Sequence, residues 1–444
     1  MLQPLSREQH LWRWRILFAT YFAYAGYYLT RKAFTICKST IAEMFSADYG
    51  ISVEAGVNLA SNAWFAYLVA YAIGQFANSF LGRRHGPRVI LLTGFGLSIV
   101  INTIFGFANS YYTFLVFMVF NGLVQASGWP GAVGGVSQWL RPHERGSIMG
   151  FWSTSYLVGN LMVKYIGGLL LDAMGWRYAF FGLSAISFGI WWIVYFWQRN
   201  KPQDVGLDPI VQKQAIDERA VRASQEDHVN ALDYFRLALN PVVLTMGVSY
   251  FCIKFLRYAL DSWLPLFLNF QGMGVGEASY YSSIFDNAGI AGAIVAGLVL
   301  DRFFRGNWAA LCFTMGLGLI AGYLSVIYLG DSPVRIAWCF GIVGFMLYGP
   351  DTLLAGAAAV QVAGEKNGVA VAGVVNGIAS TGPILQEWVI ARLVSGGVLE
   401  GIQNTNRLAL GMSVLFVFFM MIMMWRLHVT HKGHREADAR NSGL

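Results

Sequence analysis

Long apolar stretches recur along the whole chain, and short polar segments separate them. A helix that crosses the hydrocarbon of a bilayer needs about 20 apolar residues. Two sets of six stretches reach this length, with a longer polar stretch between the sets. The pattern predicts an all-α membrane protein with twelve transmembrane helices in two pseudo-symmetric six-helix halves. The predicted spans are residues 14–36, 60–82, 88–110, 112–136, 148–172, 177–199, 241–268, 281–300, 308–329, 335–358, 368–393 and 406–427.

The composition supports a membrane protein. Hydrophobic residues make up 56% of the chain and charged residues 12%, whereas charged residues make up about a quarter of a soluble domain. The 50 glycines suit close helix packing, and the 15 tryptophans suit the interfaces between lipid and water. The first apolar stretch is too long for a cleavable signal and is interpreted as a retained span. The four cysteines lie in apolar stretches, and their spacing indicates neither disulfides nor metal.

The net charge of +7 reflects membrane topology rather than nucleic-acid binding. Of the 31 lysines and arginines, 21 lie on the predicted inner face and 5 in the outer loops or their margins. Such an excess of positive charge orients membrane proteins with these loops in the cytoplasm. An even number of spans then places both termini in the cytoplasm.

The spans and loops divide the chain into four predicted parts. Residues 1–199 form an N-terminal half, 200–240 a cytoplasmic linker, 241–428 a C-terminal half, and 429–444 a cytoplasmic tail. The linker carries charges of both signs and lacks a sustained apolar face. The loop at residues 82–88 corresponds in position to the loop at residues 301–307, which indicates an internal duplication. Carriers built from repeated halves bind their substrate near the middle of the membrane, between the halves.

Two arginines inside predicted spans suggest the chemistry of the cargo. Arg31 lies 16 residues after Arg15, and Arg257 lies 17 residues after Asn240, so both are about 24–26 Å of helix rise from the inner boundary. A charge at this depth is costly unless it faces a cavity or an anion. A guanidinium binds phosphate through a planar fork and stays charged at cellular pH. We therefore expect both arginines to bind one small phosphorylated organic anion.

The alternative is that each arginine is neutralised by a buried carboxylate. Asp261 follows Arg257 by one helical turn and is the nearest candidate. The helix of Arg31 offers no acid between Arg15 and Glu43. The candidate counter-ions in predicted spans are Asp261, Asp286, Asp351 and Glu387, which a carrier could exchange for substrate phosphate.

Lys32 and Lys254 add positive charge near the two arginines, whereas Lys164 has no symmetric counterpart and is interpreted as structural or at the edge of a cavity. Most aromatic side chains in such a protein pack against lipid or core, but five tyrosines are candidate cavity hydroxyls: Tyr24, Tyr28, Tyr71, Tyr156 and Tyr348.

Three histidines at a spacing of three, His428, His431 and His434, lie in the basic tail and are interpreted as solvated rather than as metal ligands.

The sequence contains no phosphate-binding P-loop, nucleophile elbow or zinc signature. We therefore expect neither an ATP-driven pump nor an enzyme, and we expect no cofactor and no metal. Concentration gradients would supply the energy for transport.

Several stretches resemble the organophosphate:phosphate antiporter family of the major facilitator superfamily. They are YYLTRKAF (27–34), GWPG (128–131), HERGSIMGFW (143–152), KPQDVGL (201–207), DNAGIAG (286–292), DRFFRGN (301–307) and LYGP (347–350). The resemblance runs through nearly the whole chain. That family includes glycerol-3-phosphate and hexose-phosphate exchangers, a hexose-phosphate sensor and animal sugar-phosphate exchangers.

The resemblance implies roles for particular residues. Arg31 and Arg257 match the two phosphate-binding arginines of the family, and Lys32 follows as in the family. Tyr24, Tyr28 and Trp152 match cavity positions, and Asp286 matches a carboxylate of the buried charge network.

The chain also departs from the bacterial glycerol-phosphate carriers. Tyr156 and Gln75 stand where those carriers have a histidine and a lysine, and Ser262 replaces a carboxylate, with Asp261 beside it. Because these residues differ, the resemblance does not specify the organic part of the substrate.

The sequence thus predicts a monomeric antiporter that exchanges a small organophosphate for inorganic phosphate by alternating access. Two alternatives stay open: a sensor with the same fold that does not transport, and a proton-coupled symporter in which Asp261, Asp286 or Glu387 relays protons. A bacterial inner membrane is the expected location.

Overall fold

The computed structural model describes residues 5–141, 148–149, 151–152, 154–210, 239–358, 371 and 374–441. Most of the predicted linker, the HERGSIMG stretch and the beginning of the predicted span 368–393 lie outside the described residues. The side chains of the tail histidines also lie outside them. In the described part of the chain, every regular element is a helix.

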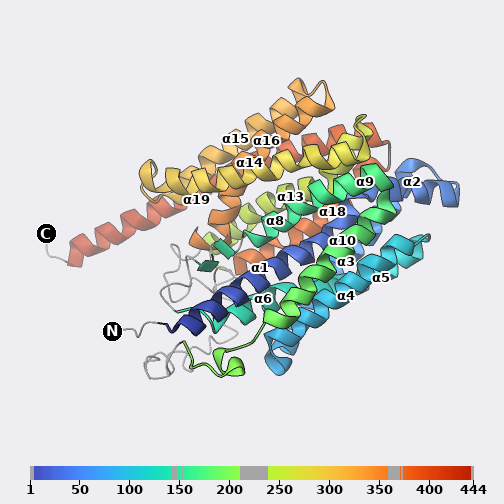
Figure 1. Cartoon of the computed structure of the whole chain (residues 1–444). Helices are drawn as coiled ribbons and strands as arrows, with labels where there is room; N and C mark the ends of the chain where they lie inside the picture. The colour runs from blue at the N-terminus through green and yellow to red at the C-terminus, as the bar shows by residue number, and fades with distance from the viewer. Residues whose placement is uncertain are drawn as a thin grey trace. The chain divides into compact units, whose positions relative to one another are not determined.

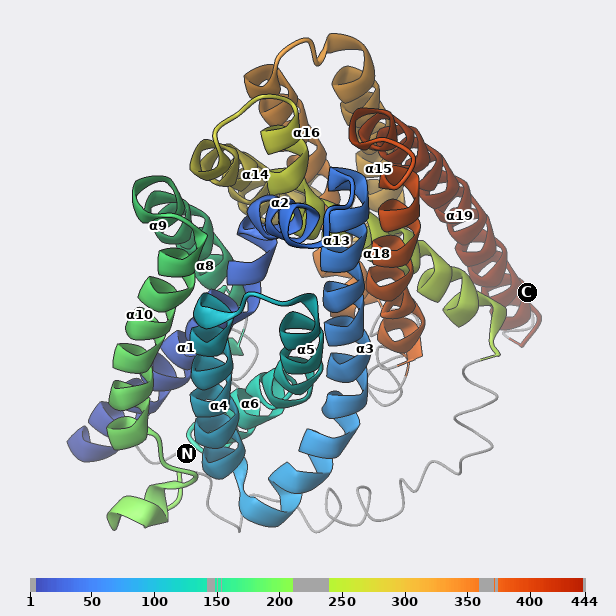
Figure 2. The ribbon, with the colours of Figure 1, turned by 90° about the vertical axis from the view of Figure 1, so that its right-hand side faces the viewer.

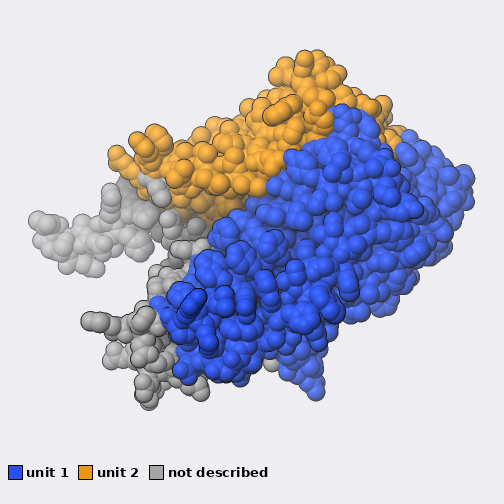
Figure 3. All heavy atoms as spheres, in the orientation of Figure 1, with its two compact units in different colours: residues 1–228, 273–280 blue, residues 229–272, 281–444 orange. Residues whose placement is uncertain are grey.

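The chain divides into two compact units, which are coloured separately in Figure 3. Unit 1 comprises residues 1–228 and 273–280, and unit 2 comprises residues 229–272 and 281–444. The predicted four-part division of the chain stays a prediction.

The helices of unit 1 follow one another along the chain, as the labels in Figure 1 show. Their bounds are α1 (Arg7–Ile36), α2 (Lys38–Tyr49), α3 (Val53–His85), α4 (Pro87–Phe107), α5 (Tyr111–Gln125), α6 (Gly128–Ser137), α8 (Ser155–Met162), the π-helix η2 (Val163–Gly167), α9 (Gly168–Met174), α10 (Trp176–Trp197) and the 3-10 turn η3 (Pro202–Val205).

Unit 2 contains the remaining helices. Their bounds are α13 (Pro241–Phe270), most of α14 (Val275–Arg302), α15 (Trp308–Leu329), α16 (Pro333–Thr352), the π-helix η5 (Leu353–Ala357), α18 (Thr381–Val394) and α19 (Val398–Asn441). Within this unit, α15 packs against α16 and α19, and α13 packs against α18 and α19.

Local signals in the sequence explain where several helices begin. Ser6 caps α1 through its hydroxyl and forms a capping box with Gln9. Asn240 caps α13 and Ser332 caps α16, and each cap precedes a proline at the first helical position. Proline is favoured there because the amide that it lacks would have no partner in the helix.

Eight stretches in the described part of the chain are long and apolar enough to cross a membrane. The predicted span 308–329 coincides with α15, and the span 177–199 agrees with α10 within two residues at each end. The predicted span 112–136 is interrupted between α5 and α6. The helix α2 was not predicted, since its sequence is short and partly polar.

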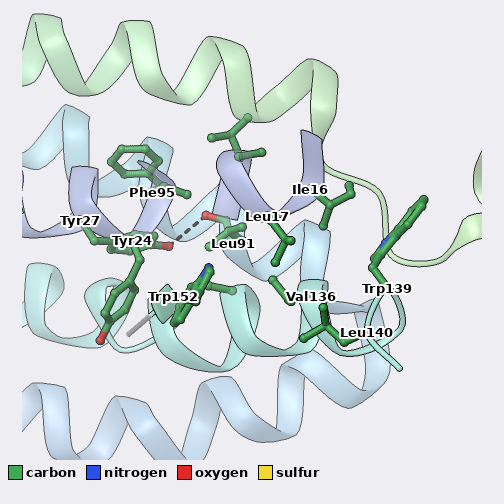
Figure 4. Packing of buried hydrophobic residues seen from close by; sticks show 14 of the residues in the cluster. Ile16, Leu17, Tyr24, Tyr27, Leu91, Phe95, Val136, Trp139, Leu140 and Trp152 are labelled. Carbon is green, nitrogen blue, oxygen red and sulfur yellow. Dashed lines mark hydrogen bonds between the residues drawn. The ribbon is translucent and has the colours of Figure 1, made fainter. Parts of the chain in front are cut away.

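The core of unit 1 gathers around α1, which packs against α4, α6, α8 and α10. Figure 4 shows the buried cluster, in which Tyr24 and Tyr27 of α1 lie among residues of α4 and α6. The Tyr27 hydroxyl donates to the carbonyl of Leu91 at 2.9 Å and is also bonded to the Ser127 hydroxyl at 2.8 Å. These bonds hold α1 at the break between α5 and α6.

The helices α3 and α5 pack side by side along much of their length, as Figure 2 shows. Gly122 of α5 allows this approach, because a Cβ at that position would lie 2.4 Å from the carbonyl oxygen of Tyr67. Small residues at such contacts are typical of helix packing in membranes. The packing places Tyr71 of α3 and Gln125 at the end of α5 beside Arg31, in the last two turns of α1.

Unit 1 also contains the first residues of α14. The amide of Gly276 donates to the Asp172 carboxylate at 2.8 Å, and the Ser279 hydroxyl donates to the carbonyl of Lys164 at 3.0 Å. Lys164 belongs to the π-helix η2, and its side chain is buried. The backbone of Lys164 thus helps to attach the start of α14 to η2, and the structural interpretation of its charged side chain stays a prediction.

Candidate substrate-binding site

Arg31 lies in the last two turns of α1 and is only 8% exposed. Its Nε donates to Oε1 of Gln125 on α5 at 3.2 Å. Its guanidinium carbon lies 4.7 Å from the ring centroid of Tyr28 and 4.8 Å from that of Tyr71, so two aromatic faces flank the cation. Within the described residues, the Nη2 atom is buried and has no hydrogen-bond partner.

Gln125 orients the Arg31 guanidinium. Its amide nitrogen donates to the Thr30 hydroxyl at 2.8 Å and to the carbonyl of Tyr27 at 3.3 Å. These two bonds fix the amide with its oxygen toward Arg31. Gln125 was not among the predicted site residues, although a glutamine inside the predicted span 112–136 is a signal that could have identified it.

Lys32 is buried and its Nζ lies 5.4 Å from the ring centroid of Trp64 on α3. Trp64 stacks on Tyr67, and Tyr67 stacks on Tyr71. The two neighbouring cations of α1 therefore lie at opposite ends of one aromatic column on α3. The spacing of Trp64, Tyr67 and Tyr71 follows the helical period, which could have predicted the column.

The other aromatic candidates of unit 1 continue this arrangement. The rings of Tyr24 and Tyr28 lie 5.7 Å apart, and those of Tyr28 and Tyr156 lie 6.0 Å apart. The ring of Trp152 lies 5.6 Å from that of Tyr24, and its indole nitrogen donates to Thr20 at 3.1 Å. Tyr24 and Trp152 are buried in the core (Figure 4), whereas Tyr28 and Tyr156 are partly exposed.

Arg257 of α13 forms an ion pair with Asp351 of α16. Its Nη1 donates to Oδ2 of Asp351 at 2.6 Å, and its guanidinium carbon lies 4.9 Å from the ring centroid of Tyr348. Asp261 was the predicted partner for this ion pair, and Asp351 was only among the wider candidates. Asp351 comes from another helix, and the spacing along one helix could not reveal that contact.

Asp286 of α14 accepts a hydrogen bond from the Tyr348 hydroxyl at 3.0 Å. Tyr348 thus links Arg257 to Asp286, since its ring lies against Arg257 and its hydroxyl contacts Asp286. The ring has room because Gly289 faces it; a Cβ there would lie 2.4 Å from the ring. Asp261 is partly buried on α13.

Lys254, one turn before Arg257, points toward residues that precede α18. Its Nζ donates to Oδ1 of Asn376 at 2.6 Å and to the Ser380 hydroxyl at 3.3 Å. Its Nζ lies 5.0 Å from the ring centroid of Tyr250. Asn376 and Ser380 are one helical turn apart and were not predicted as site residues.

Glu387 is fully buried and binds neutral donors. It accepts from the indole nitrogen of Trp263 at 2.8 Å and from the Ser262 hydroxyl at 3.2 Å. These bonds attach α18 to α13. The described contacts of Glu387 are therefore those of a packing residue.

Each unit thus brings together several of the candidates that it contains. In unit 1, Arg31 contacts Tyr28 and Tyr71, and in unit 2, Arg257 contacts Tyr348 beside Lys254. Both arginines present a delocalised cation among aromatic rings, an arrangement that suits a phosphoryl group. The expectation that the two arginines bind one ligand concerns both units together and stays a prediction.

The sequence model of the Major Facilitator Superfamily matches residues 16–386. The chain belongs to this superfamily. Membership confirms the predicted fold class, because the superfamily fold consists of twelve transmembrane helices in two halves. It also establishes that the chain belongs to a family of membrane transporters.

Curated relatives confirm the resemblance to the organophosphate:phosphate antiporter family. A probable hexose phosphate transport protein of Chlamydia pneumoniae is 26% identical over 80% of this chain and 80% of its own. The membrane sensor protein UhpC of Salmonella typhimurium is 26% identical over 93% of this chain and 94% of its own. A glucose-6-phosphate exchanger of Danio rerio is 27% identical over 82% of this chain and 81% of its own.

Solved structures agree with the superfamily fold. A bacterial homologue of the lysosomal transporter Spinster aligns with a TM-score of 0.72 and 17% identity, over 93% of this chain and 97% of that one. A D-xylose-proton symporter aligns with a TM-score of 0.69 and 13% identity, over 92% of this chain and 97% of that one.

Proposed function

We propose that this chain exchanges a small organophosphate, such as a sugar phosphate, for inorganic phosphate by alternating access. The observation that supports this proposal most strongly is the buried, unpartnered Nη2 of Arg31 among the described residues. A buried cationic donor without a partner is costly. An anionic ligand with several acceptor oxygens would satisfy it.

The surroundings of Arg31 favour an anion with spread charge. Tyr28 and Tyr71 flank the guanidinium, and Gln125 occupies its Nε. A guanidinium held in one plane donates in a fixed direction, which matches two oxygens of a phosphoryl group. Among the described residues, Arg31 forms no ion pair that a substrate would have to displace.

Arg257 would contribute differently because it is already paired with Asp351. Its side chain is 16% exposed, so part of this side chain is accessible to a ligand. We propose that a phosphoryl group binds this accessible part. The ion pair would then also balance the charge of Arg257 when no substrate is bound.

The names of the relatives support the class of substrate. Hexose phosphate transport and glucose-6-phosphate exchange are named for proteins that are 26% and 27% identical to this chain. The bacterial relatives also favour a bacterial inner membrane for this chain. The asymmetry of basic residues supports cytoplasmic termini.

Counterflow in liposomes tests the proposal. The purified protein is reconstituted into liposomes that contain inorganic phosphate, and the uptake of a labelled hexose phosphate is measured without a proton gradient. We expect uptake that depends on internal phosphate and is insensitive to a protonophore. Uptake that needs a proton gradient would instead support a symporter and would contradict the proposal.

The second candidate function is that of a sensor. The similarity to a membrane sensor protein over 93% of this chain favours it. A sensor would bind the same ligands but would not carry them. Ligand-dependent thermal stabilisation of the purified protein, together with the absence of counterflow in liposomes, would identify the sensor.

A further inference from the structure

The carboxylate of Asp351 has only one of its oxygens occupied. Asp351 follows Pro350 near the end of α16, directly before the π-helix η5. Its Oδ2 accepts from Arg257. Its Oδ1 is buried and has no hydrogen-bond partner in the described part of the chain, and the side chain is only 5% exposed.

The polar neighbours of Asp351 in unit 2 direct their hydrogen bonds elsewhere. The Tyr348 hydroxyl donates to Asp286, and the Lys254 Nζ donates to Asn376 and Ser380. A buried carboxylate oxygen that lacks a donor is costly, because it has lost water without a replacement. The missing donor would therefore come from a ligand.

Charge restricts the kind of ligand group that can approach Oδ1. A phosphoryl oxygen would be repelled by the carboxylate, since both carry negative charge. A hydroxyl or an ammonium group would instead donate to it, and carboxylates bind such donors strongly. The phosphoryl group of the same ligand would remain free to contact the accessible part of Arg257.

We propose that Asp351 is a specificity-determining residue, whose Oδ1 accepts a hydrogen bond from a hydroxyl or ammonium group on the organic part of the substrate. The proposal rests on the proposed function, because it assumes that an organophosphate binds beside Arg257. It adds that a phosphorylated compound without a donor on its organic part is a poor substrate.

Three phosphate monoesters of similar size test the proposal: ethyl phosphate, hydroxyethyl phosphate and aminoethyl phosphate. They differ in the terminal group, which is a methyl, a hydroxyl or an ammonium. Each compound competes with labelled phosphate for exchange in liposomes. With the unchanged protein, at least one of the two donor-bearing compounds should inhibit at concentrations about tenfold lower than ethyl phosphate, as for one hydrogen bond to a charged group.

Asp351→Asn removes the acceptor while it keeps the partner of Arg257. Arginine can only donate, so the amide oxygen will face Arg257 and the amide nitrogen will face the ligand. The preference for the ammonium compound should therefore fall to within about twofold of unity, because an ammonium can only donate. The preference for the hydroxyl compound should weaken by less, because its hydroxyl can accept from the amide nitrogen in place of donating to a charged carboxylate. In the unchanged protein, a preference for the ammonium compound alone would identify a charged donor, and a preference for both compounds would identify a hydrogen bond without a requirement for charge.

Glu387→Gln is the matched control, since it neutralises another buried carboxylate of the same unit that already has donors. It should keep the preference. Equal inhibition by all three compounds in the unchanged protein, or an unchanged preference in Asp351→Asn, would overturn the role of Asp351. Absence of phosphate exchange in the unchanged protein would instead overturn the proposed function, and thermal stabilisation of the purified protein by the three compounds would then test Asp351 by itself.

Discussion

The two arginines that the sequence singled out lie in different surroundings. Arg31 is flanked by two tyrosines and bonded to a neutral amide, whereas Arg257 is paired with a carboxylate. The difference comes from their neighbours on other helices, α5 for Arg31 and α16 for Arg257. The two arginines lie at matching depths in their predicted spans, but only Arg257 has a carboxylate partner among the described residues.

Replacing Arg31 with lysine should remove most exchange while the protein still inserts into the membrane. A guanidinium can donate to Gln125 and to a phosphoryl group at once because its donors form a planar fork, and an ammonium has no such fork. A lysine also cannot stack on Tyr28 and Tyr71 as the guanidinium does. We expect the counterflow rate to fall by at least about tenfold, the loss of roughly one charge-assisted hydrogen bond. Exchange at the original rate in this variant would contradict the phosphate-binding role of Arg31.

Gln125→Glu should reduce phosphate binding because it places a carboxylate beside Arg31. Glutamate keeps the shape of glutamine, and its oxygen would lie where Oε1 now lies, 3.2 Å from Nε. The internal anion would compete with the substrate, and we expect the apparent affinity for phosphate to fall by at least about tenfold. Gln125→Met is the comparison, since it removes the hydrogen bond without adding charge. An equal loss in both variants would show that competition by charge is not the cause.

At the scale of elements, glycines decide how closely the helices approach. Gly344 of α16 faces α14, where a Cβ would lie 2.2 Å from the carbonyl oxygen of Phe285. Likewise, a Cβ at Gly292 of α14 would lie 2.0 Å from the carbonyl oxygen of Phe345. This close packing holds Asp286 of α14 within reach of Tyr348 of α16.

Gly344→Ala should therefore destabilise the protein, because backbone atoms cannot move as easily as the end of a side chain. We expect a cost of about 1–3 kcal/mol in the free energy of unfolding. Its thermal midpoint in detergent should fall measurably. Gly411→Ala in α19 is the control, since no atom lies within 4 Å of its Cβ, and its midpoint should be unchanged or slightly higher. Equal midpoints for the two variants would contradict this account of the packing.

At the scale of the whole molecule, the superfamily fold and the distribution of charge describe how the chain lies in a membrane. The predicted inner loops hold 21 of the 31 basic residues. This excess concerns only loops and helix ends. The buried cations that we propose bind the substrate are not counted in this excess.

Labelling of single cysteines tests the predicted orientation. The four native cysteines are buried, so they should react slowly with a membrane-impermeant maleimide. A cysteine at Asp331, in the exposed connection between α15 and α16, should react in intact cells. A cysteine at Ser6, before α1, should react only after permeabilisation. The opposite pattern would contradict cytoplasmic termini.

The fold was largely predictable because its signals are local. Apolar length identifies spans such as 308–329, and capping residues such as Asn240 mark where helices begin. The interruption between α5 and α6 was harder to predict, since the apolar pattern continues across it. Ser127 lies at this interruption, and its hydroxyl contacts Tyr27 on another helix.

The candidate site was predictable only in part. Charged residues in an apolar span are conspicuous, so Arg31, Lys32, Lys254 and Arg257 could be named from the sequence. Their partners are ordinary polar residues such as Gln125 and Asn376. Their local sequence marks them at most as polar residues in apolar spans and does not show which cation each one binds, because a hydrogen bond between helices depends on packing that is distant along the chain.

The sequence by itself determined the membrane class, the number of spans, the predicted orientation and the cations that need an explanation, because all of these follow from hydropathy and charge along one dimension. Only the tertiary structure decided which carboxylate pairs with Arg257 and which oxygen of Asp351 is left without a donor. It also decided that Arg31 lies between two tyrosines. These facts depend on contacts across helices, and close packing selects one partner among several that the sequence allows.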